Sequence, residues 1–494
     1  MPRLIEASGR GALAAAAATA TALLLATSAA LAQTIAPLPA TVAPAAPLPP
    51  VAGVLTLDRV LAGSARFAPQ IVEALQRARA ADGRSLAAEG AFDTVFSAEG
   101  RSRVAGFYDG TFVEGKVYRP LTSNGGQLYG SYRLSQGDFP IYEDQYYTNS
   151  LGEVKVGALF ALMRDRFIDD RRFGVDVARR EADAVALEGR MVAIGVQRRA
   201  IAAYQNWVAA GLRLAVYREL LAVASERQEN LEGQVARGLR PAILAVENRQ
   251  NIVRRRTLVT QTEQQLANAA NALSLYVRDA EGKAVVPTAA QLPSTLPAIP
   301  ATPAMTAISD RPDIQALENR LQQAERKLAL ERNSLRPRLD VRVEAGKDLG
   351  NVAEGGRSRT AAEGIVGVTF SVPLEQRGAR GRIAQAEAEI EAVRARRQLL
   401  EDQIRIELNG LGIDVRGAGE LLSLATQEAE LAERLAAAER RRFALGASDL
   451  FLVNQREETA NDARLRRVEA EFRLAAARAE LAAASADLDV LGLR

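Results

Sequence analysis

Apolar side chains recur at helical spacing over three long stretches that contain no proline: Ile141 to Arg240, Ala242 to Val286, and Leu374 to Arg494. Because proline in a helix interior costs about 3 kcal/mol, such stretches permit long helices. In the first stretch, apolar side chains follow a seven-residue spacing at Leu187, Ile194, Ile201, Val208, Ala215 and Ala222. A helix from about Arg164 to Glu232 would be roughly 100 Å long at about 1.5 Å per residue.

Each long helix carries two apolar stripes. In the first stretch, Val185 and Val192 lie two positions before the main stripe. In the last stretch, the two stripes consist of Ile383, Ile390, Ile404 and Leu411, and of Leu399, Ile406 and Ile413. A two-stranded coiled coil needs one stripe, whereas two offset stripes indicate neighbours on both sides. The pattern predicts a mainly α fold of long antiparallel coiled-coil helices, arranged as a closed cylinder or a sheet of helices.

Four glycines interrupt the last long helix, at Gly410, Gly412, Gly417 and Gly419. Each costs about 1 kcal/mol relative to alanine in a helix interior. Close approach of another helix and local bending are the two explanations.

The long helices end at similar turns. Gly238 and Gly446 suit the residue after a helix C-terminus, Pro241 suits the first turn that follows, and Ser448 or Asp449 suits an N-cap. The two glycines are 208 positions apart (446 minus 238), and strands, long helix, turn and return helix recur in the same order. This order predicts two structural repeats.

Four segments alternate between apolar and polar residues, at residues 92–100, 127–135, 339–347 and 364–372. Strands of about 9 to 11 residues are long enough to cross an outer membrane when tilted. Seven of the ten tyrosines lie between Tyr108 and Tyr147, near the first strand pair, where interfacial aromatic residues are expected. A small soluble antiparallel sheet is the alternative reading.

The amino terminus has the pattern of an export signal. Arg3 and Arg10 precede an uncharged stretch that closes with Ala30, Leu31 and Ala32. We expect a signal peptide over residues 1–32, with an uncleaved membrane anchor as the alternative. Residues 33–53 are rich in proline and predict an extended, mobile leader. No later stretch approaches 18 uncharged apolar residues, so no transmembrane helix is expected in the mature chain.

Composition removes many functions. The chain has neither Cys nor His, so thiol nucleophiles, imidazole bases and the usual zinc ligands are absent, and no cofactor or metal is expected. No Gly-Lys pair is followed by the Ser or Thr of a phosphate-binding loop. The carboxylate pairs Glu387/Glu391 and Asp169/Asp170 lie among arginines, as solvated helix faces do, so no enzyme is expected. A net charge of +3 with interleaved signs does not favour nucleic-acid binding.

The order of these elements resembles the TolC-like outer-membrane factors. Six segments carry the resemblance, at residues 87–100, 132–142, 163–185, 335–346, 371–398 and 445–457. It implies a homotrimer, in which four strands per chain form one 12-stranded outer-membrane β-barrel and the helices form a long periplasmic α-barrel. It further implies a first repeat over residues 54–300 and a second over residues 301–494. The expected location is the outer membrane of a Gram-negative bacterium, in contact with its lipid and extending into the periplasm.

The resemblance also implies a function without catalysis. The protein would be a passive exit duct of a tripartite efflux pump or a type I secretion system, working with a periplasmic adaptor and an inner-membrane pump. The sequence leaves open whether small molecules, proteins or polysaccharides are exported. A soluble periplasmic coiled-coil adaptor or scaffold is the alternative from another class.

In the family, the two helix turns form a tip that binds the adaptor and narrows the pore. The matching tip positions are Arg237, Gly238 and Leu239 in the first turn, and Leu445, Gly446 and Ala447 in the second. Candidate constriction residues are Phe443, Asp449, Leu452, Asn454 and Gln455. The family's acidic ring falls on Leu452 and Gln455, with Leu244 at the corresponding place of the first turn, so an aspartate ring is not expected here.

Overall fold

The computed structural model describes residues 53–140, 147–300, 307–352 and 361–493. The expected signal peptide and almost all of the expected leader lie outside these residues. The described chain divides into two compact units. The sheet unit comprises Ala87–Val175 and Arg326–Gln385, and the helical unit comprises the described part of Pro47–Leu86 together with Asp176–Glu325 and Ala386–Arg494.

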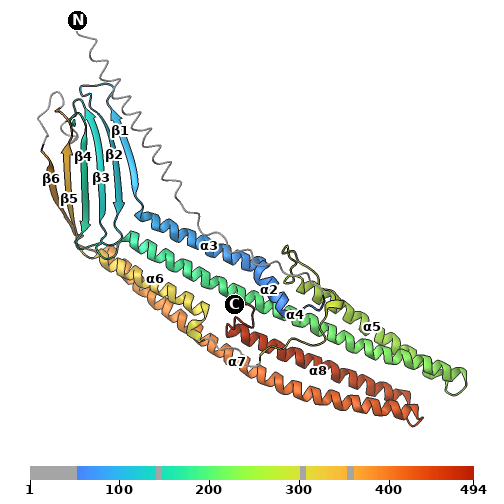
Figure 1. Cartoon of the computed structure of the whole chain (residues 1–494). Coiled ribbons are helices and arrows are strands. Elements are labelled where there is room, and N and C mark those ends of the chain that lie inside the picture. Colours follow the sequence, from blue (N-terminus) through green and yellow to red (C-terminus); the bar gives the residue numbers. More distant parts are fainter. Residues whose placement is uncertain (1–52, 141–146, 301–306, 353–360, 494) are drawn as a thin grey trace, which may run out of the picture. The chain divides into compact units, whose positions relative to one another are not determined.

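The sheet unit contains one antiparallel sheet of six strands in the order of the sequence (Figure 1). The strands are β1 (Val95–Ser102), β2 (Thr111–Pro120), β3 (Gln127–Gln136), β4 (Glu153–Ala161), β5 (Arg338–Asp348) and β6 (Glu363–Ser371). Adjacent strands pair over seven to ten residues, and β4 joins the first half of the chain to the second by pairing with β5. The sheet therefore unites both expected repeats.

The sequence predicted four of these strands, and the count of four per chain was wrong because β2 and β4 were missed. Both strands alternate, but apolar residues on the polar side weaken the contrast. Phe112 of β2 is buried beneath the guanidinium of Arg133, 4.9 Å from the ring centroid. Leu159 and Ala161 likewise lie on the polar side of β4. The first predicted strand also began too early, because Phe92 belongs to the short helical turn η2 (Gly90–Phe92).

The prediction of a mainly helical chain is confirmed. The helices are α2 (Leu57–Phe67), α3 (Pro69–Glu89), α4 (Asp170–Ala236), α5 (Ala242–Leu273), α6 (Pro312–Ser334), α7 (Arg377–Ala444) and α8 (Leu450–Ala484), and short turns η4 (Ala289–Gln291) and η5 (Ile308–Asp310) lie between α5 and α6. The two long helices, α4 and α7, have 67 and 68 residues, and each is followed by a shorter return helix. None of the helices in the described part of the chain has the length and apolar character needed to cross a membrane.

The start of α4 lies six residues after the predicted one, because a tight junction precedes it. Asp165 has a positive φ of 67°, and Asp169 accepts a hydrogen bond from the backbone N–H of Arg172 at 2.9 Å, as an N-cap does. The Arg172 guanidinium donates to the carbonyl oxygens of Asp165 and Arg166. Asn333, from the second half of the chain, donates to the Asp165 carboxylate at 2.9 Å. These bonds fix the point at which β4 passes into α4.

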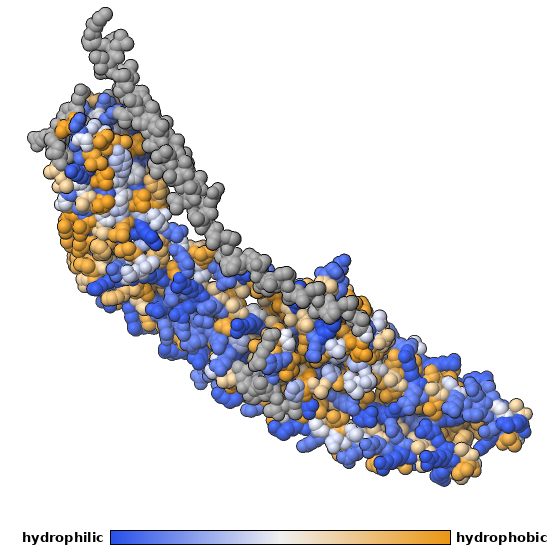
Figure 2. All heavy atoms as spheres, viewed as in Figure 1, coloured by the Kyte–Doolittle hydropathy of each residue, from blue (hydrophilic) through white to orange (hydrophobic). Residues whose placement is uncertain are grey.

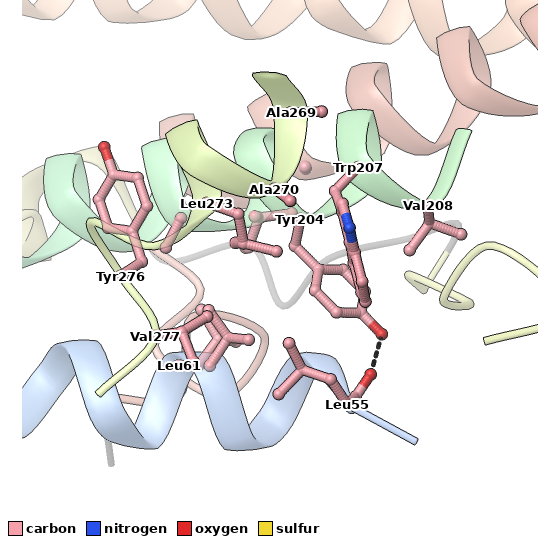
Figure 3. Close-up of a cluster of buried hydrophobic side chains, with 14 of the residues drawn as sticks. Leu55, Leu61, Tyr204, Trp207, Val208, Ala269, Ala270, Leu273, Tyr276 and Val277 are labelled. Atoms are coloured by element: carbon pink, nitrogen blue, oxygen red, sulfur yellow. Dashed lines mark hydrogen bonds between the residues drawn. The ribbon is translucent and has the colours of Figure 1, made fainter. Parts of the chain in front are cut away.

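The helical unit has its core where α2, α4, α5 and the end of α8 meet (Figure 3). Trp207 is fully buried there beside Tyr204, whose hydroxyl donates to the carbonyl of Leu55 at 2.7 Å. Burial raises the pKa of Tyr204 to about 12, so this hydroxyl stays protonated and able to donate. Gln197 of α4 donates to the carbonyl of Leu61, and both contacts hold the segment around α2 against α4.

The two helical hairpins lie side by side in the helical unit (Figure 1). Ion pairs run from α4 to α8, for example Arg213 to Glu469 at 2.6 Å and Glu219 to Arg464 at 2.6 Å. Others join α8 to α7, as in Arg466 to Glu428 at 2.7 Å. The chain therefore doubles back at both expected turns, as the repeated order of elements predicted.

Candidate membrane and pore surfaces

The six-stranded sheet places most apolar side chains on one face and nearly all charged side chains on the other; the register puts only Arg119 and Lys347 of its charged residues on the apolar face. The register shows this directly, because directly opposed residues share a face and side chains alternate along each strand. The apolar face carries Phe96 and Ala98 of β1, Val113 and Val117 of β2, Leu128, Tyr132 and Leu134 of β3, Val154, Val156, Ala158 and Phe160 of β4, Leu339, Val341, Val343 and Ala345 of β5, and Val366, Val368 and Phe370 of β6.

This apolar face is open to the surroundings in the single chain. On β6, the exposed fractions are 72% for Val366, 65% for Val368 and 62% for Phe370. Val156 and Val343 are also exposed. Hydrophobic residues gather over the strands in Figure 2. A contiguous apolar surface of this kind marks an interaction site, because its removal from water is energetically favourable.

The opposite face, which we call the charged face, carries both signs. Its charged residues are Glu99, Arg101, Glu114, Lys116, Arg133, Glu153, Lys155, Arg338, Asp340, Arg342, Glu344, Asp348 and Glu363. Several form ion pairs with the residue two positions away on the same strand: Lys155 lies 3.0 Å from Glu153, and Arg338 lies 2.6 Å from Asp340. The hydroxyl of Tyr129 donates to Glu344. This face suits contact with water, so the sheet separates an aqueous side from an apolar side.

The two outer strands are open at their free edges. Within the described residues, β1 pairs with β2 alone and β6 pairs with β5 alone. All eight residues of β1 are exposed, and all but one of the nine residues of β6 are. Such edges present backbone N–H and C=O groups that pair readily with another strand.

Both helix turns have the same capping geometry. In the first turn, Gly238 has a φ of 70°, and Leu239 N–H donates to the Gln234 carbonyl at 2.9 Å. In the second, Gly446 has a φ of 78°, and Ala447 N–H donates to the Arg442 carbonyl at 2.8 Å. These are Schellman motifs, in which glycine adopts the left-handed conformation at low cost. The expected helix-capping role of both glycines is confirmed.

The two turns also contact each other. The guanidinium of Arg240, after the first turn, lies 5.1 Å from the ring centroid of Phe443, before the second. The six predicted tip residues are all exposed, namely Arg237, Gly238, Leu239, Leu445, Gly446 and Ala447. The turns therefore form one surface at the end of the two hairpins, and the adaptor-binding role of these residues stays a prediction.

The five predicted constriction residues have different environments. Asp449 is the N-cap of α8, and its carboxylate accepts from Leu452 N–H at 2.7 Å. Asn454 is buried and accepts from Arg227 at 2.9 Å. Phe443 and Leu452 are half-buried, and Gln455 is exposed. The N-cap expected at Ser448 or Asp449 is thus Asp449, and the pore roles stay predictions.

Behind the turns lies a buried charge cluster that the sequence analysis missed. Glu457 of α8 is 3% exposed, and its carboxylate accepts from Arg227 of α4 and, at 3.0 Å, from Arg255 of α5. Arg440 of α7 lies 4.0 Å from the same carboxylate. Burial lowers the pKa of the Arg227 guanidinium, while the Glu457 charge acts in the opposite direction. One carboxylate therefore joins four helices.

A sequence signal for this cluster exists. Leu450, Val453, Glu457 and Ala460 follow helical spacing, and all four are buried, so Glu457 occupies a position in an apolar stripe. A charged residue at such a position is rarely buried without a partner. The two arginines that donate to Glu457, Arg227 and Arg255, lie 230 and 202 positions away and have no local signal.

The four glycines of α7 have no helix packed against them in the described chain. A Cβ at Gly410, Gly417 or Gly419 would meet nothing within 4 Å, and one at Gly412 would meet only the Arg416 side chain at 3.8 Å. Close approach within one chain therefore does not explain them.

Three comparisons with known proteins bear on this geometry. Residues 305–487 match the family model described as outer membrane efflux protein. No curated protein matches the chain. Solved structures do: the outer membrane protein VceC from Vibrio cholerae is 16% identical over 88% of this chain and 96% of its own, with a TM-score of 0.59.

Two other solved channels are similar to the same extent. The MtrE outer membrane channel of Neisseria gonorrhoeae, solved in its open state, is 14% identical over 89% of each chain, with a TM-score of 0.58. The CmeC outer membrane channel of Campylobacter jejuni is 13% identical over 87% of this chain and 85% of its own, with a TM-score of 0.57. At these identities the likeness shows the fold, and it confirms the resemblance seen in the sequence.

Neutralising Glu457 should destabilise the helical unit. We expect Glu457→Gln to lower the free energy of unfolding by about 3–5 kcal/mol, because it leaves the buried Arg255 and the half-buried Arg227 without their counter-charge. The measurement is denaturant unfolding of the detergent-solubilised protein, followed by circular dichroism. Glu458→Gln is the matched control, because Glu458 makes an exposed ion pair with Arg254 and such pairs contribute about 1 kcal/mol or less. Equal stability of the two variants would contradict this account of the cluster.

Proposed function

Because residues 305–487 carry the outer membrane efflux protein domain and the described chain has the fold of the outer-membrane channels, we propose that this protein is a passive exit duct in the outer membrane. It performs no catalysis. An inner-membrane pump supplies the energy, a periplasmic adaptor joins the pump to the duct, and substrates cross the periplasm and the outer membrane through it.

The amphipathic sheet is the observation that carries this proposal. All six strands direct apolar side chains to one face and nearly all their charged side chains to the other. Strand lengths of 8 to 11 residues suit a tilted membrane crossing. We infer that lipid contacts the apolar face and water contacts the charged face. A soluble adaptor or scaffold has no need of an exposed apolar sheet, so this alternative is not favoured.

Two open surfaces support self-association of this chain. Open strand edges are not tolerated in lipid, so β1 and β6 need partner strands from other copies. On α7, the stripe of Leu399, Ile406 and Ile413 is exposed in the single chain, with 72% exposure at Ile406, whereas Ile390 and Ile404 of the other stripe are buried. One stripe of α7 is thus buried within the chain, and the other can pack against a neighbouring copy. The number three comes from the family resemblance.

The tip surface is proposed as the adaptor-binding site. Exposed apolar side chains gather there, at Leu239, Ile243, Leu445 and Phe451. Ile243 and Phe451 are again 208 positions apart (451 minus 243), so the two hairpins present similar side chains. Exposed apolar residues at a helix turn offer contact area to another helical hairpin. The chemistry of this surface fits both an efflux pump and a type I secretion system.

We propose that the gate closes by apolar packing of Leu452 and Phe443, with the polar residues Asn454 and Gln455 nearby. We expect Leu452→Ser to admit water and to raise the sensitivity of cells to a large antibiotic that the outer membrane normally excludes. The measurement is the growth-inhibitory concentration, together with the conductance of the purified channel. Leu431→Ser, at an exposed leucine of α7 remote from the turns, is the control. Unchanged conductance and sensitivity in the Leu452 variant would refute apolar closure.

Fractionation tests the proposed function itself. We expect the protein, expressed with its own amino-terminal segment in a Gram-negative host, to enter the outer-membrane fraction. Unboiled samples should migrate in a gel as a trimer that heat converts to the monomer. A soluble periplasmic monomer or dimer would overturn the duct and return the coiled-coil scaffold as the better function.

A further inference from the structure

We propose that this protein closes an outer-membrane barrel of eighteen strands, six from each of three copies, in place of the twelve that the family resemblance implies. This inference rests on the proposed function and concerns the interface between copies. Its central claim is that the β1–β2 hairpin is part of the membrane wall and that β1 of one copy pairs with β6 of the next.

The β1–β2 hairpin belongs to the sheet by its backbone pairing. β2 pairs with β3 over ten residues, from Thr111 opposite Gln136 to Pro120 opposite Gln127. This register is longer than the seven-residue pairing of β3 with β4. Removing the hairpin from the wall would break the ladder between β2 and β3, and lipid offers no replacement for those hydrogen bonds.

The hairpin also has the same two faces as the other four strands. Phe96 lies in one row with Val117 and Val156, on the apolar face. Glu114 and Lys116 lie on the charged face and form an ion pair of 3.0 Å. A hairpin outside the membrane would expose Phe96, Val113 and Val117 to water, whereas inside the wall these side chains contact lipid.

Chain direction allows the closure. Six strands that are antiparallel in sequence order leave β1 and β6 running in opposite directions at the two edges. In a ring of copies related by rotation, β1 therefore meets the next copy's β6 in antiparallel orientation. Their lengths, eight and nine residues, differ by only one residue.

Side chains at these edges agree with the pairing. The apolar face of β1 continues into the apolar face of β6, so the lipid-facing band is uninterrupted around the ring. On the charged face, Arg101 lies near the end of β1 and Glu363 begins β6, so both lie at the same end of the strands. Opposite charges on paired strands stabilise the pairing. The occupant of each open edge is therefore a second copy of this chain.

A wider lumen follows. Barrel diameter grows roughly linearly with strand number, so eighteen strands enclose a channel about 1.5 times as wide as twelve strands would. Because both signs of charge line the charged face, the barrel wall itself favours neither anions nor cations. The duct at the outer membrane would then admit larger cargo, and the selection of cargo would lie elsewhere in the exporting system.

Cysteine pairs test the interface cleanly, because the native chain contains no cysteine. We would introduce Ser97→Cys in β1 together with Ile365→Cys, Gly367→Cys or Thr369→Cys in β6, all on the charged face. Three β6 positions sample the register, which the single chain does not fix. Within one copy, β1 and β6 are five strand spacings of about 4.8 Å apart, too far for a disulfide, so any bond must join two copies.

We expect oxidation of membrane-embedded protein to convert the monomer band of at least one Ser97 pair into covalent dimer and trimer bands, which reductant reverses. Ser131→Cys in β3, combined with the same three β6 positions, is the matched control. If the hairpin is in the wall, β3 lies about three strand spacings from the next copy's β6 and should not react.

The failures are distinguishable. Disulfides from Ser131 and none from Ser97, in a heat-dissociable outer-membrane trimer, would mean that four strands per copy form the wall; this overturns the eighteen strands and leaves the duct intact. Absence of both kinds of disulfide in such a trimer also overturns the proposed pairing. If no outer-membrane trimer forms in the wild-type chain, the proposed function itself fails.

Discussion

The open edges of the six-stranded sheet constrain everything else in this protein. A strand buried in lipid must pair its backbone groups on both sides, because hydrocarbon offers no hydrogen bonds. β1 and β6 each have one partner within the described chain. The apolar face adds a second demand, since Val366, Val368 and Phe370 need a non-aqueous surrounding. The proposed self-association in a membrane would satisfy both demands at once.

The helical unit, like the sheet, leaves an apolar surface exposed in the single chain. Its core around Trp207 and Tyr204 is complete within one chain, and the buried Glu457 cluster holds four helices together. The second apolar stripe of α7 nevertheless remains exposed. One apolar stripe of α7 therefore stabilises the single chain, and the other, on a different face of the same helix, is free to pack against another copy.

Much of the fold could be predicted because its signals are local. Seven-residue spacing predicted α4 and α7, and the glycines at 238 and 446 predicted both turns, which adopt the left-handed conformation expected of them. β2 and β4 were missed where Phe112 and Leu159 place apolar groups on the charged face. Neither the strand order nor the pairing of β4 with β5 has a local signal, because the paired residues lie about 190 positions apart.

The candidate site residues also fall into those with a local sequence signal and those without one. Asp449 could be predicted as an N-cap from its position before α8. The contacts of Glu457 with Arg227 and Arg255 could not, because they depend on how the two hairpins pack, which involves the whole of four helices. The turn residues lie at the two turns, as predicted, and are exposed; their binding to an adaptor stays a prediction.

Two neighbouring residues of β6 allow the most direct test of the central claim, that lipid covers one face of the sheet and water the other. Val368 lies on the apolar face and Thr369 on the charged face, and both are exposed in the single chain. We would measure the amount of heat-dissociable trimer in the outer membrane for Val368→Arg and Thr369→Arg. The account predicts a large loss for Val368→Arg, because an arginine facing lipid near the midplane costs about 2–4 kcal/mol, and little change for Thr369→Arg. Equal amounts of trimer in the two variants would contradict it.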